Sequence, residues 1–422
     1  MSKVPELIVI GCGSRGTGYA GFVKNFPEKA KIVACAEPRD FYRNRVGDDH
    51  NIPEEFRFHD WRDVLARPKF ADAVLICTQD AMHEEPAIAA AKLGYNILLE
   101  KPMAPTAAAC RRIVAAVKEA NVTFAVCHVL RYTAFTRKLK EVLNTGAIGD
   151  IVSIQHLEGL QHWHQAHSFV RGNWRNEEES SFMLLAKCCH DLDWLRYVMG
   201  FKCLKAHSFG SLFHFNKANQ PAGAADRCVD CPAGVEAFCP YSALKIYLRD
   251  RVFKGNTGWP TAVLTTDTTA EGVLKALQEG PYGRCVYACD NDVVDHQTVN
   301  LEFENGATAV FTMAGCSQYG KRQMAIFGSH GEIRGDGETL TLHTYLTGET
   351  RSIPIPPPDP GDRHGGGDSN LLKSFVKAIR TGDRTELITG LESSMESHML
   401  VFAAERSRHE NRAVSMAEML KK

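Results

Sequence analysis

A run of six residues near the start of the chain has the spacing of a phosphate-binding turn. It reads Gly-Cys-Gly-Ser-Arg-Gly over residues 11–16 and follows the apolar segment 7–10. Glycines at its first, third and sixth positions permit a tight turn, and the helix expected after them offers N–H groups and partial positive charge to a pyrophosphate. We therefore predict a dinucleotide site that includes Gly11, Gly13, Ser14, Arg15 and Gly16.

The residues after the second apolar segment bear on which dinucleotide binds. Glu37 follows the segment 32–36, where a carboxylate can accept hydrogen bonds from the ribose 2′-hydroxyl, and this favours NAD. Arg39 and Arg43 come shortly after it, and either guanidinium would pair with a 2′-phosphate and admit NADP. We expect NAD and keep NADP open.

Lys101 is the first candidate for chemistry on a substrate. An apolar run ends in Leu98-Leu99-Glu100-Lys101-Pro102, which places Lys101 at the carboxyl edge of a sheet, where ligands of such folds bind. A carbinol gives up a hydride only as its hydroxyl proton leaves, so a base and a neighbouring positive charge both assist that reaction. A surface cation is the structural alternative for this lysine.

The elements that must position these residues alternate in type over residues 6–128. Short β-rich runs are separated by helical stretches, which is typical of a doubly wound, mostly parallel α/β sheet. The expected strands are 7–10, 31–36, 73–77, 96–99 and 123–127, and the expected helices include 86–93 and 107–120. We predict a Rossmann-type nucleotide-binding domain over residues 1–130.

Residues 131–422 predict a second, α+β domain with a large, mostly antiparallel open sheet. A strand is expected at 151–158 and helices at 183–198 and 370–379. Three further strands are expected to be adjacent and antiparallel, at 299–304, 307–314 and 323–327, with a hairpin turn at 304–306. Residues from about 216 to 285 are rich in Gly, Pro and Cys and indicate an insertion.

Five short motifs carry a resemblance to a known family. They are the glycine turn, Thr78-Gln79-Asp80-Ala81-Met82-His83, Glu100-Lys101-Pro102, Gly146-Ala147-Ile148-Gly149-Asp150 and His190-Asp191-Leu192-Asp193-Trp194-Leu195. In this order they resemble the motifs of the Gfo/Idh/MocA oxidoreductases over nearly the whole chain. The resemblance implies a Rossmann domain, a C-terminal α/β domain whose open sheet often mediates oligomers, and hence a homo-oligomer, either a dimer or a tetramer.

The resemblance also implies a reaction and roles for individual residues. The reaction is hydride transfer between a nicotinamide and a hydroxyl or carbonyl carbon of a sugar, cyclitol or related polyol. Lys101 would hydrogen-bond the reacting oxygen, and His190 would act as general acid or base. Thr78, His83, Glu100 and Lys101 would join the glycine turn in binding the cofactor.

One position departs from the family pattern. Many members carry an Asp four residues before the histidine, whereas this chain has Ala186 there and Lys187 beside it. Lys187 would supply a second proton-transfer or oxyanion-stabilising group if it faces the same pocket as Lys101. The alternative places Lys187 on a solvated face of its helix.

Several polar and aromatic residues are candidates for binding a polyol. Forked donors and an aromatic face suit hydroxyl groups and the C–H side of a sugar ring, although a structural loop explains the segment 169–176 equally well. The candidates are Arg171, Trp174, Arg175, Asp193 and His364. We expect the nearby His162, His164 and His167 to be solvated or to face the substrate, because no carboxylate or thiol lies at metal-ligand spacing from them.

Three cysteines are grouped in the polar insertion. Cys228 and Cys231 form a C-x2-C pair, and Cys239 follows after seven residues, which is a spacing that holds zinc. The set is one ligand short, and Cys203, His207, His214, Cys285 or Cys289 would have to complete it. Structural zinc is therefore one expectation, and reduced thiols in a compact loop are the other.

Composition limits the classes of protein to which the chain can belong. Its 422 residues include 49 Lys or Arg and 50 Asp or Glu, for a formal charge of −1, with 44% hydrophobic and 23% charged residues. Nucleic-acid and anionic-membrane partners usually need a basic surplus, so we expect neither. The first ten residues lack a basic, signal-like start, and several cysteines lie in apolar runs, so we expect a reducing, cytoplasmic location.

Two further functions stay open beside the dehydrogenase. An NAD-dependent enzyme could oxidise a sugar transiently so that elimination cleaves a glycosidic bond before re-reduction. A protein of another class would bind a dinucleotide as a sensor without catalysis, and the absence of the usual Asp at Ala186 favours this reading.

Overall fold

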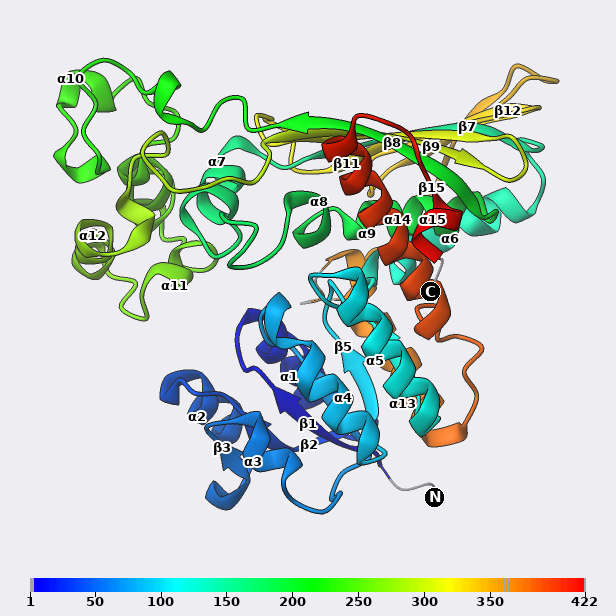
Figure 1. The fold of residues 1–422 in the computed structure, drawn as a ribbon, viewed down its shortest axis with the longest axis horizontal. Helices are drawn as coiled ribbons and strands as arrows, with labels where there is room; N and C mark the ends of the chain where they lie inside the picture. Colours follow the sequence, from blue (N-terminus) through cyan, green and yellow to red (C-terminus); the bar gives the residue numbers. More distant parts are fainter. Residues whose placement is uncertain (1–3, 360–361, 363, 421–422) are drawn as a thin grey trace.

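A six-stranded parallel sheet forms the N-terminal half of the computed structural model, which describes residues 4–359, 362 and 364–420 (Figure 1). Its strand order is β3-β2-β1-β4-β5-β6. The strands are β1 Glu6–Ile10, β2 Lys31–Ala36, β3 Arg57–Phe58, β4 Ala73–Ile76, β5 Asn96–Leu99 and β6 Phe124–Val126. The doubly wound sheet is confirmed, and only the two-residue β3 was not predicted.

Helices α1 Ser14–Asn25, α2 Asp40–Asp49, α3 Trp61–Leu65, α4 Glu84–Lys92 and α5 Ala107–Ala120 lie between these strands in the chain. The ends of α5 show how local sequence sets them. The Thr106 side chain accepts a hydrogen bond from the Ala109 N–H at the first turn, and Asn121 ends the helix in a left-handed conformation, with φ of 50°.

A nine-stranded mixed sheet forms the second half, in the order β14-β13-β12-β11-β7-β10-β9-β8-β15. The strands are β7 Ile151–Gly159, β8 Cys203–Ser211, β9 His296–Phe303, β10 Thr308–Ala314, β11 Arg322–Gly328, β12 Gly331–Gly335, β13 Leu340–Thr344, β14 Thr350–Ile353 and β15 Val414–Ser415. The predicted hairpin joins β9 to β10, but β11 is not next to β10. β7 lies between them, parallel to β10 and antiparallel to β11.

Helices cover one face of this sheet and lie between it and the Rossmann half (Figure 1). They include α6 Ala134–Asn144, α8 Met183–Ala186, α9 Cys189–Met199 and α14 Leu391–Glu410, with α15 Met416–Leu420 after β15. The single helix expected at 183–198 is therefore interrupted at Lys187 and Cys188. The expected helix 370–379 is α13 Gly367–Thr381, which packs in one apolar cluster with β1 and α1 of the Rossmann half.

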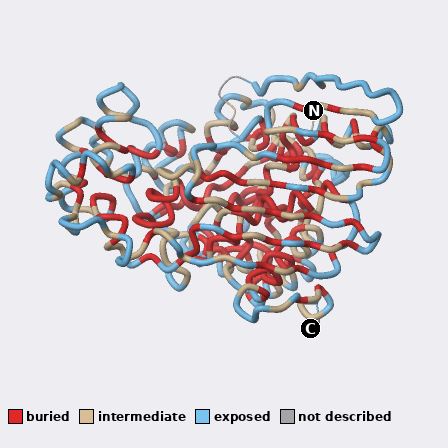
Figure 2. Tube along the Cα trace, turned by 90° about the horizontal axis from the view of Figure 1, so that it is seen from above, coloured by how far each residue is buried: buried red, intermediate tan, exposed pale blue. Residues whose placement is uncertain are grey.

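The predicted insertion is a helical unit between β8 and β9 that extends away from both sheets (Figure 1). It has its own small hydrophobic core, and exposed chain surrounds that core on most sides (Figure 2). Its longer elements are α10 Ala233–Glu236, the π-helix η7 Leu244–Arg249, α11 Thr261–Leu264 and α12 Ala270–Glu279, and it packs on α7 His162–His164 and the π-helix η4 Gln165–Arg171.

Short 3-10 turns complete the fold. They are η1 Glu54–Phe56, η2 Asp80–Met82, η3 Val129–Tyr132, η5 Lys217–Asn219, η6 Cys228–Asp230, η8 Val252–Lys254, η9 Pro281–Gly283 and η10 His364–Gly366. Within the described part of the chain, no helix combines the length and apolar character that a membrane crossing requires.

Candidate functional site

The glycine turn has the close packing that a dinucleotide cradle requires. Gly11 has φ of +88°, and a Cβ there would lie 2.7 Å from the Cys77 backbone. A Cβ on Gly16 would lie 1.9 Å from the carbonyl oxygen of Gly11, so the start of α1 can pack on the turn only without a side chain. Helix α1 begins at Ser14 with no side-chain cap and no acidic residue in its first turn, which suits a pyrophosphate. Gly13 is the N-cap of this helix.

Glu37 and Arg39 form a pair beside the turn. The buried Glu37 carboxylate accepts hydrogen bonds from the Cys12 N–H at 2.9 Å and from Arg39 Nε at 2.7 Å. Burial opposes ionisation, but the contacts with Arg39 hold the pKa of Glu37 below its usual value. Arg43 is buried and donates to the Glu37 carbonyl and to Asp40, so Arg39 is the guanidinium of this pair that remains largely exposed.

The side chain of Arg15 joins the two halves of the molecule. Its Nε lies 2.7 Å from Glu100, and its Nη1 and Nη2 donate to Asp368 at 3.0 and 2.7 Å. His364 lies on the other side of Asp368 at 2.9 Å. Because the guanidinium is committed to these carboxylates, the predicted contact of Arg15 with a cofactor would fall to its backbone.

Thr78 and His83 belong to the loop that follows β4. The fully buried His83 ring contacts the Pro102 carbonyl through Nδ1 at 2.7 Å and the Thr78 carbonyl through Nε2 at 3.1 Å. Glu100 accepts from the Lys101 N–H at 3.0 Å. His83 therefore connects the loop after β4 to the loop that carries Lys101.

Lys101, Lys187 and His190 come from different parts of the chain, and all three lie at or beside the break between α8 and α9. Lys101 follows β5, and its Nζ donates to the carbonyl of Ala186 at 2.7 Å. Lys187 occupies the interruption itself, and His190 lies in the first turn of α9. Lys187 therefore lies in a turn between two helices and not on a solvated helix face, which was the alternative prediction.

His190 has the features of a base that stays neutral. Its Nδ1 is buried without a partner among the described residues, so Nε2 is the nitrogen available to a ligand. Burial, then the charge of Lys101, lowers the pKa of His190 well below its usual value, and His128, Arg322 and His364 act in the same direction.

One carboxylate on β7 and one on α9 form ion pairs with the positively charged side chains near the break. Glu158 lies 3.1 Å from Lys187 Nζ and 3.2 Å from Arg322 Nε, and Arg322 Nε also lies 2.6 Å from Asp191. His156 contacts the same Asp191 at 2.8 Å. Burial alone would raise the pKa of Asp191, but Arg322 and His156 hold it below its usual value. Sequence reasoning missed Glu158 and Arg322, because only strand pairing brings them to Lys187.

Two residues that were predicted to bind substrate, Asp193 and Arg171, contact other residues of the protein. Both oxygens of the fully buried Asp193 are held by Arg131, at 2.8 and 2.5 Å. Arg171, the last residue of η4, is buried against the insertion and donates to the carbonyls of Arg284 and Tyr241, at 2.7 and 2.8 Å. Both charged side chains therefore have partners within the protein.

The three other residues predicted to bind substrate differ in how much they contact the rest of the protein. Arg175 pairs with Asp290 through two contacts, at 2.9 and 3.0 Å, and anchors the end of the insertion. Trp174 is half-buried against Phe169. His364 is partly exposed above Asp368 and contributes charge to the His190 environment.

The histidines of the segment 162–167 lie in different environments. Burial, followed by the charges of Lys187, His167 and Lys101, holds the pKa of His164 well below its usual value. His167 instead bonds the Tyr247 hydroxyl at 2.8 Å within the core of the insertion. The sequence signal for His164 was the cluster of three histidines, but nothing in the sequence distinguished it from its neighbours.

The cysteines do not form a zinc site. Among the described residues, Cys228, Cys231 and Cys239 do not converge into a ligand set, and all 14 cysteines are free thiols. Cys228 contacts the Arg171 guanidinium at 3.5 Å, as expected of a thiol packed in a compact loop. This corrects the zinc expectation in favour of its alternative.

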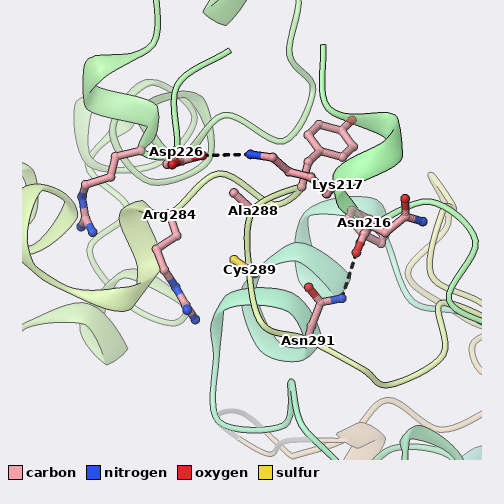
Figure 3. Close-up of a pocket in the computed structure, with 10 residues that line it drawn as sticks. Asn216, Lys217, Asp226, Arg284, Ala288, Cys289 and Asn291 are labelled. Atoms are coloured by element: carbon pink, nitrogen blue, oxygen red, sulfur yellow. Dashed lines mark hydrogen bonds and ion pairs between the residues drawn. The ribbon is translucent and has the colours of Figure 1, made fainter. Parts of the chain in front are cut away.

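A pocket of about 510 Å³ lies in the insertion, lined by residues that include Lys217, Asp226, Arg284 and Asn291 (Figure 3). Lys217 and Asp226 pair across it at 3.2 Å. None of the residues predicted to bind cofactor or substrate lines this pocket.

Comparison with known families agrees with the two halves of the fold. A model described as an oxidoreductase family with an NAD-binding Rossmann fold matches residues 6–128. A second model, for the C-terminal alpha/beta domain of the same oxidoreductase family, matches residues 140–416. Together they cover both sheets.

Individual relatives have low sequence identity to this chain. A myo-inositol 2-dehydrogenase of Thermotoga maritima is 23% identical, with 98% of each chain aligned. A 2,7-anhydro-N-acetylneuraminate hydratase of Escherichia coli is 29% identical over 46% of this chain and 49% of its own. The alignments with three of the matched relatives span only 36–50% of their lengths. A levoglucosan dehydrogenase solved with NADH and levoglucosan has a TM-score of 0.71 at 19% identity, over 98% of this chain and 99% of its own, and so shares the fold.

Proposed function

The chain belongs to the Gfo/Idh/MocA oxidoreductase family, and from this we propose that it transfers a hydride between NAD and a hydroxyl or carbonyl carbon of a sugar, cyclitol or related polyol. The observation that carries the proposal is that Lys101, which follows β5 at the carboxyl edge of the Rossmann sheet, reaches the break between α8 and α9, beside the buried His190. The names of the relatives, an inositol dehydrogenase and a levoglucosan dehydrogenase, support this substrate class.

The residues around the glycine turn fit a dinucleotide. The space that a Cβ would fill at Gly11 and Gly16, together with the uncapped start of α1, accommodates a pyrophosphate. Glu37 would accept hydrogen bonds from the ribose hydroxyls, with Arg39 beside it. NAD, when bound, supplies the acceptor or donor of the hydride.

The side chains of this protein would move the proton and stabilise charge. In the oxidative direction His190 Nε2 takes the hydroxyl proton, because its low pKa keeps it neutral and able to accept. The Lys101 ammonium donates a hydrogen bond to the same oxygen as negative charge develops there. Lys187, held by Glu158, places a second positive charge nearby.

Cofactor binding and turnover test this proposal together. Calorimetry with NAD and NADP should show preferential NAD binding, and a panel of polyols, aldoses and glycosides should yield NADH with at least one member. Lys101→Ala should lose most turnover and still bind NAD. Turnover of no member by the NAD-loaded protein would overturn the dehydrogenase, and an unchanged Lys101→Ala phenotype would favour the sensor.

A second candidate is the cleavage of a glycosidic bond through transient oxidation. The observation that favours it is the similarity to a hydratase, because adding water to a substrate makes no net NADH. His190 and Lys101 would assist both the oxidation and the re-reduction of the sugar within one turnover. Tightly retained NAD and product formation without NADH release would identify this reaction.

We also propose that the protein forms a homo-oligomer, a dimer or tetramer, through the uncovered face of the nine-stranded sheet. Helices cover only the opposite face, and the outward positions include Leu157, Phe209, Val310 and Phe327. Light scattering would measure the assembly. The 14 free thiols support our proposal of a reducing, cytoplasmic location.

A further inference from the structure

The pocket in the insertion is separate from the proposed hydride-transfer site. Its volume of about 510 Å³ is in the range of cavities that bind small molecules. The residues that line it lie within the segments 215–217, 226–227 and 284–291. Among the described residues, neither Lys101 nor His190 contributes to this lining. A ligand bound in the pocket would therefore occupy a site of its own.

Lys217 and Asp226 form a weak ion pair at the pocket. Lys217 Nζ lies 3.2 Å from the Asp226 carboxylate, and the two side chains are 69% and 79% exposed. Exposed pairs of this kind add little to stability, because water screens both charges. Lys217 can therefore turn from Asp226 to an anion in the pocket with little loss of stabilisation.

The two arginines of the lining make the pocket electropositive. Arg284 pairs with Asp290 through Nη1 at 2.6 Å. Arg227 donates to the carbonyls of Leu277 and Gly280, at 2.7 and 2.6 Å, and within the described part of the chain no carboxylate forms an ion pair with it. The lining thus has one positive charge that no carboxylate balances, which favours an anionic ligand.

Asn291 offers an acceptor that the protein itself does not use. The residue is 9% exposed, and its Nδ2 donates to the Phe215 carbonyl at 3.1 Å. Its Oδ1 is buried and accepts no hydrogen bond from the described residues. Figure 3 shows this side chain across the pocket from Lys217 and Asp226. A buried carbonyl oxygen without a donor costs free energy, and a hydroxyl of a ligand would supply that donor.

We propose that this pocket is a second ligand site, for a small hydroxylated anion, which is the chemistry that sugar phosphates and sugar acids share. Lys217 would donate to the anionic group, and Arg227 and Arg284 would add positive charge around it. A hydroxyl of the same ligand would donate to Asn291 Oδ1. The site goes beyond the proposed hydride transfer, since the ligand is bound there and not oxidised.

Calorimetry on the purified full-length protein tests the site. The probes are glucose 6-phosphate and gluconate, compared with inorganic phosphate, acetate and neutral glucose. At least one of the two hydroxylated anions should bind at least about tenfold more tightly than the simple anions and than glucose, because only it has both the charge and the hydroxyl groups. The tighter of the two identifies the source as a sugar phosphate or a sugar acid.

Three variants locate that binding. Lys217→Gln should weaken it by about tenfold, because a charge-assisted hydrogen bond is lost. Lys254→Gln is the matched control, since it removes a 67% exposed lysine of the insertion that does not line the pocket, and it should leave the affinity unchanged. Asn291→Ala should bring the hydroxylated anion close to the simple anion in affinity. If Asn291→Ala does not fold, the two lysine variants still decide.

Several outcomes would overturn the site. They are binding of no probe, equal binding of simple and hydroxylated anions, and an affinity that Lys217→Gln leaves intact or that Lys254→Gln lowers equally. Lys101→Ala should keep the affinity, and its loss in that variant would place the anion at the hydride-transfer site instead. None of these measurements needs NADH to form, so this proposal and the proposed dehydrogenase can fail separately.

Discussion

Glu158 Oε1, near the end of β7, lies 3.1 Å from Nζ of Lys187 in the break between α8 and α9. The contact fixes a lysine at the position next to Ala186, where many relatives of this family carry an aspartate. Glu158, a carboxylate on a strand, thus lies near the position where the helix of those relatives carries its aspartate. The charged contacts of Glu158 are with Lys187 and Arg322, so we expect it to position Lys187.

A double-mutant cycle tests this positioning role. Lys187→Met should lower kcat by about a hundredfold, and Glu158→Gln by about tenfold, because the freed ammonium no longer points at the reacting oxygen. The double variant should match Lys187→Met alone. Fully additive losses, measured as kcat on the best polyol substrate, would mean that Glu158 acts independently of Lys187.

The pH profile should report the low pKa of His190. A base whose pKa is held well below the usual value stays unprotonated at lower pH, so the acid limb of kcat/KM should fall well below about pH 6.5. His190→Asn should remove that limb along with most activity. A limb at the ordinary histidine value would contradict the assignment.

Two glycines of α1 provide a matched pair of substitutions. Gly16→Ala should abolish NAD binding and cost about 3 kcal/mol of stability, because its methyl group would collide with the Gly11 carbonyl. Gly21 has open space around it in the same helix, so Gly21→Ala should keep NAD affinity and stabilise by about 0.5–1 kcal/mol. Calorimetry and urea unfolding measure both. Equal behaviour of the two variants would refute the cradle.

Cofactor preference should depend on Glu37. Its buried carboxylate would repel a 2′-phosphate, so we expect NAD to bind at least about tenfold more tightly than NADP. Glu37→Gln removes the charge and leaves Arg39 free to meet the phosphate, which should bring the two affinities close together. The two dissociation constants, measured for both proteins, check this, and a preference unmoved by the substitution would argue against Glu37 as the determinant.

Acid stability should depend on the buried His128. Its ring is fully buried, neither nitrogen has a hydrogen-bond partner among the described residues, and Nε2 lies 3.8 Å from Asp193. Burial lowers its pKa from 6.5 to about 3. The unfolded chain binds this proton more readily, so stability is complete above about pH 6.5 and falls as the pH drops towards 3, by about 2 kcal/mol at about pH 5. His128→Leu should flatten that fall in urea unfolding. An identical slope would show that other groups carry the effect.

Sequence patterns predicted the Rossmann half because its strands are short apolar runs whose neighbours are separated by single helices. They did not predict the order of the second sheet. β7 reaches its place between β10 and β11 across more than a hundred residues, and hairpin signals report only local pairs.

Residue types alone also do not distinguish a charged side chain that is paired within the protein from one that is open to a ligand. Arg171 and Asp193 have the chemistry of sugar ligands, but a buried charge requires a partner, and the structure shows that each has one. What the sequence does specify well is the backbone of the turn and the order of the family motifs.

The packing of α13 against β1 and α1 has a consequence for biosynthesis. Leu371, Leu372 and Phe375 complete the apolar cluster that begins with Leu7 and Val9. During translation the first part of the chain leaves the ribosome long before those residues do. Its share of the apolar cluster therefore stays partly exposed until the C-terminal part of the chain has been made. We expect nucleotide capture to be a late, post-translational event, and chains that stall before α13 to be substrates for chaperones and proteases rather than stable NAD-binding fragments.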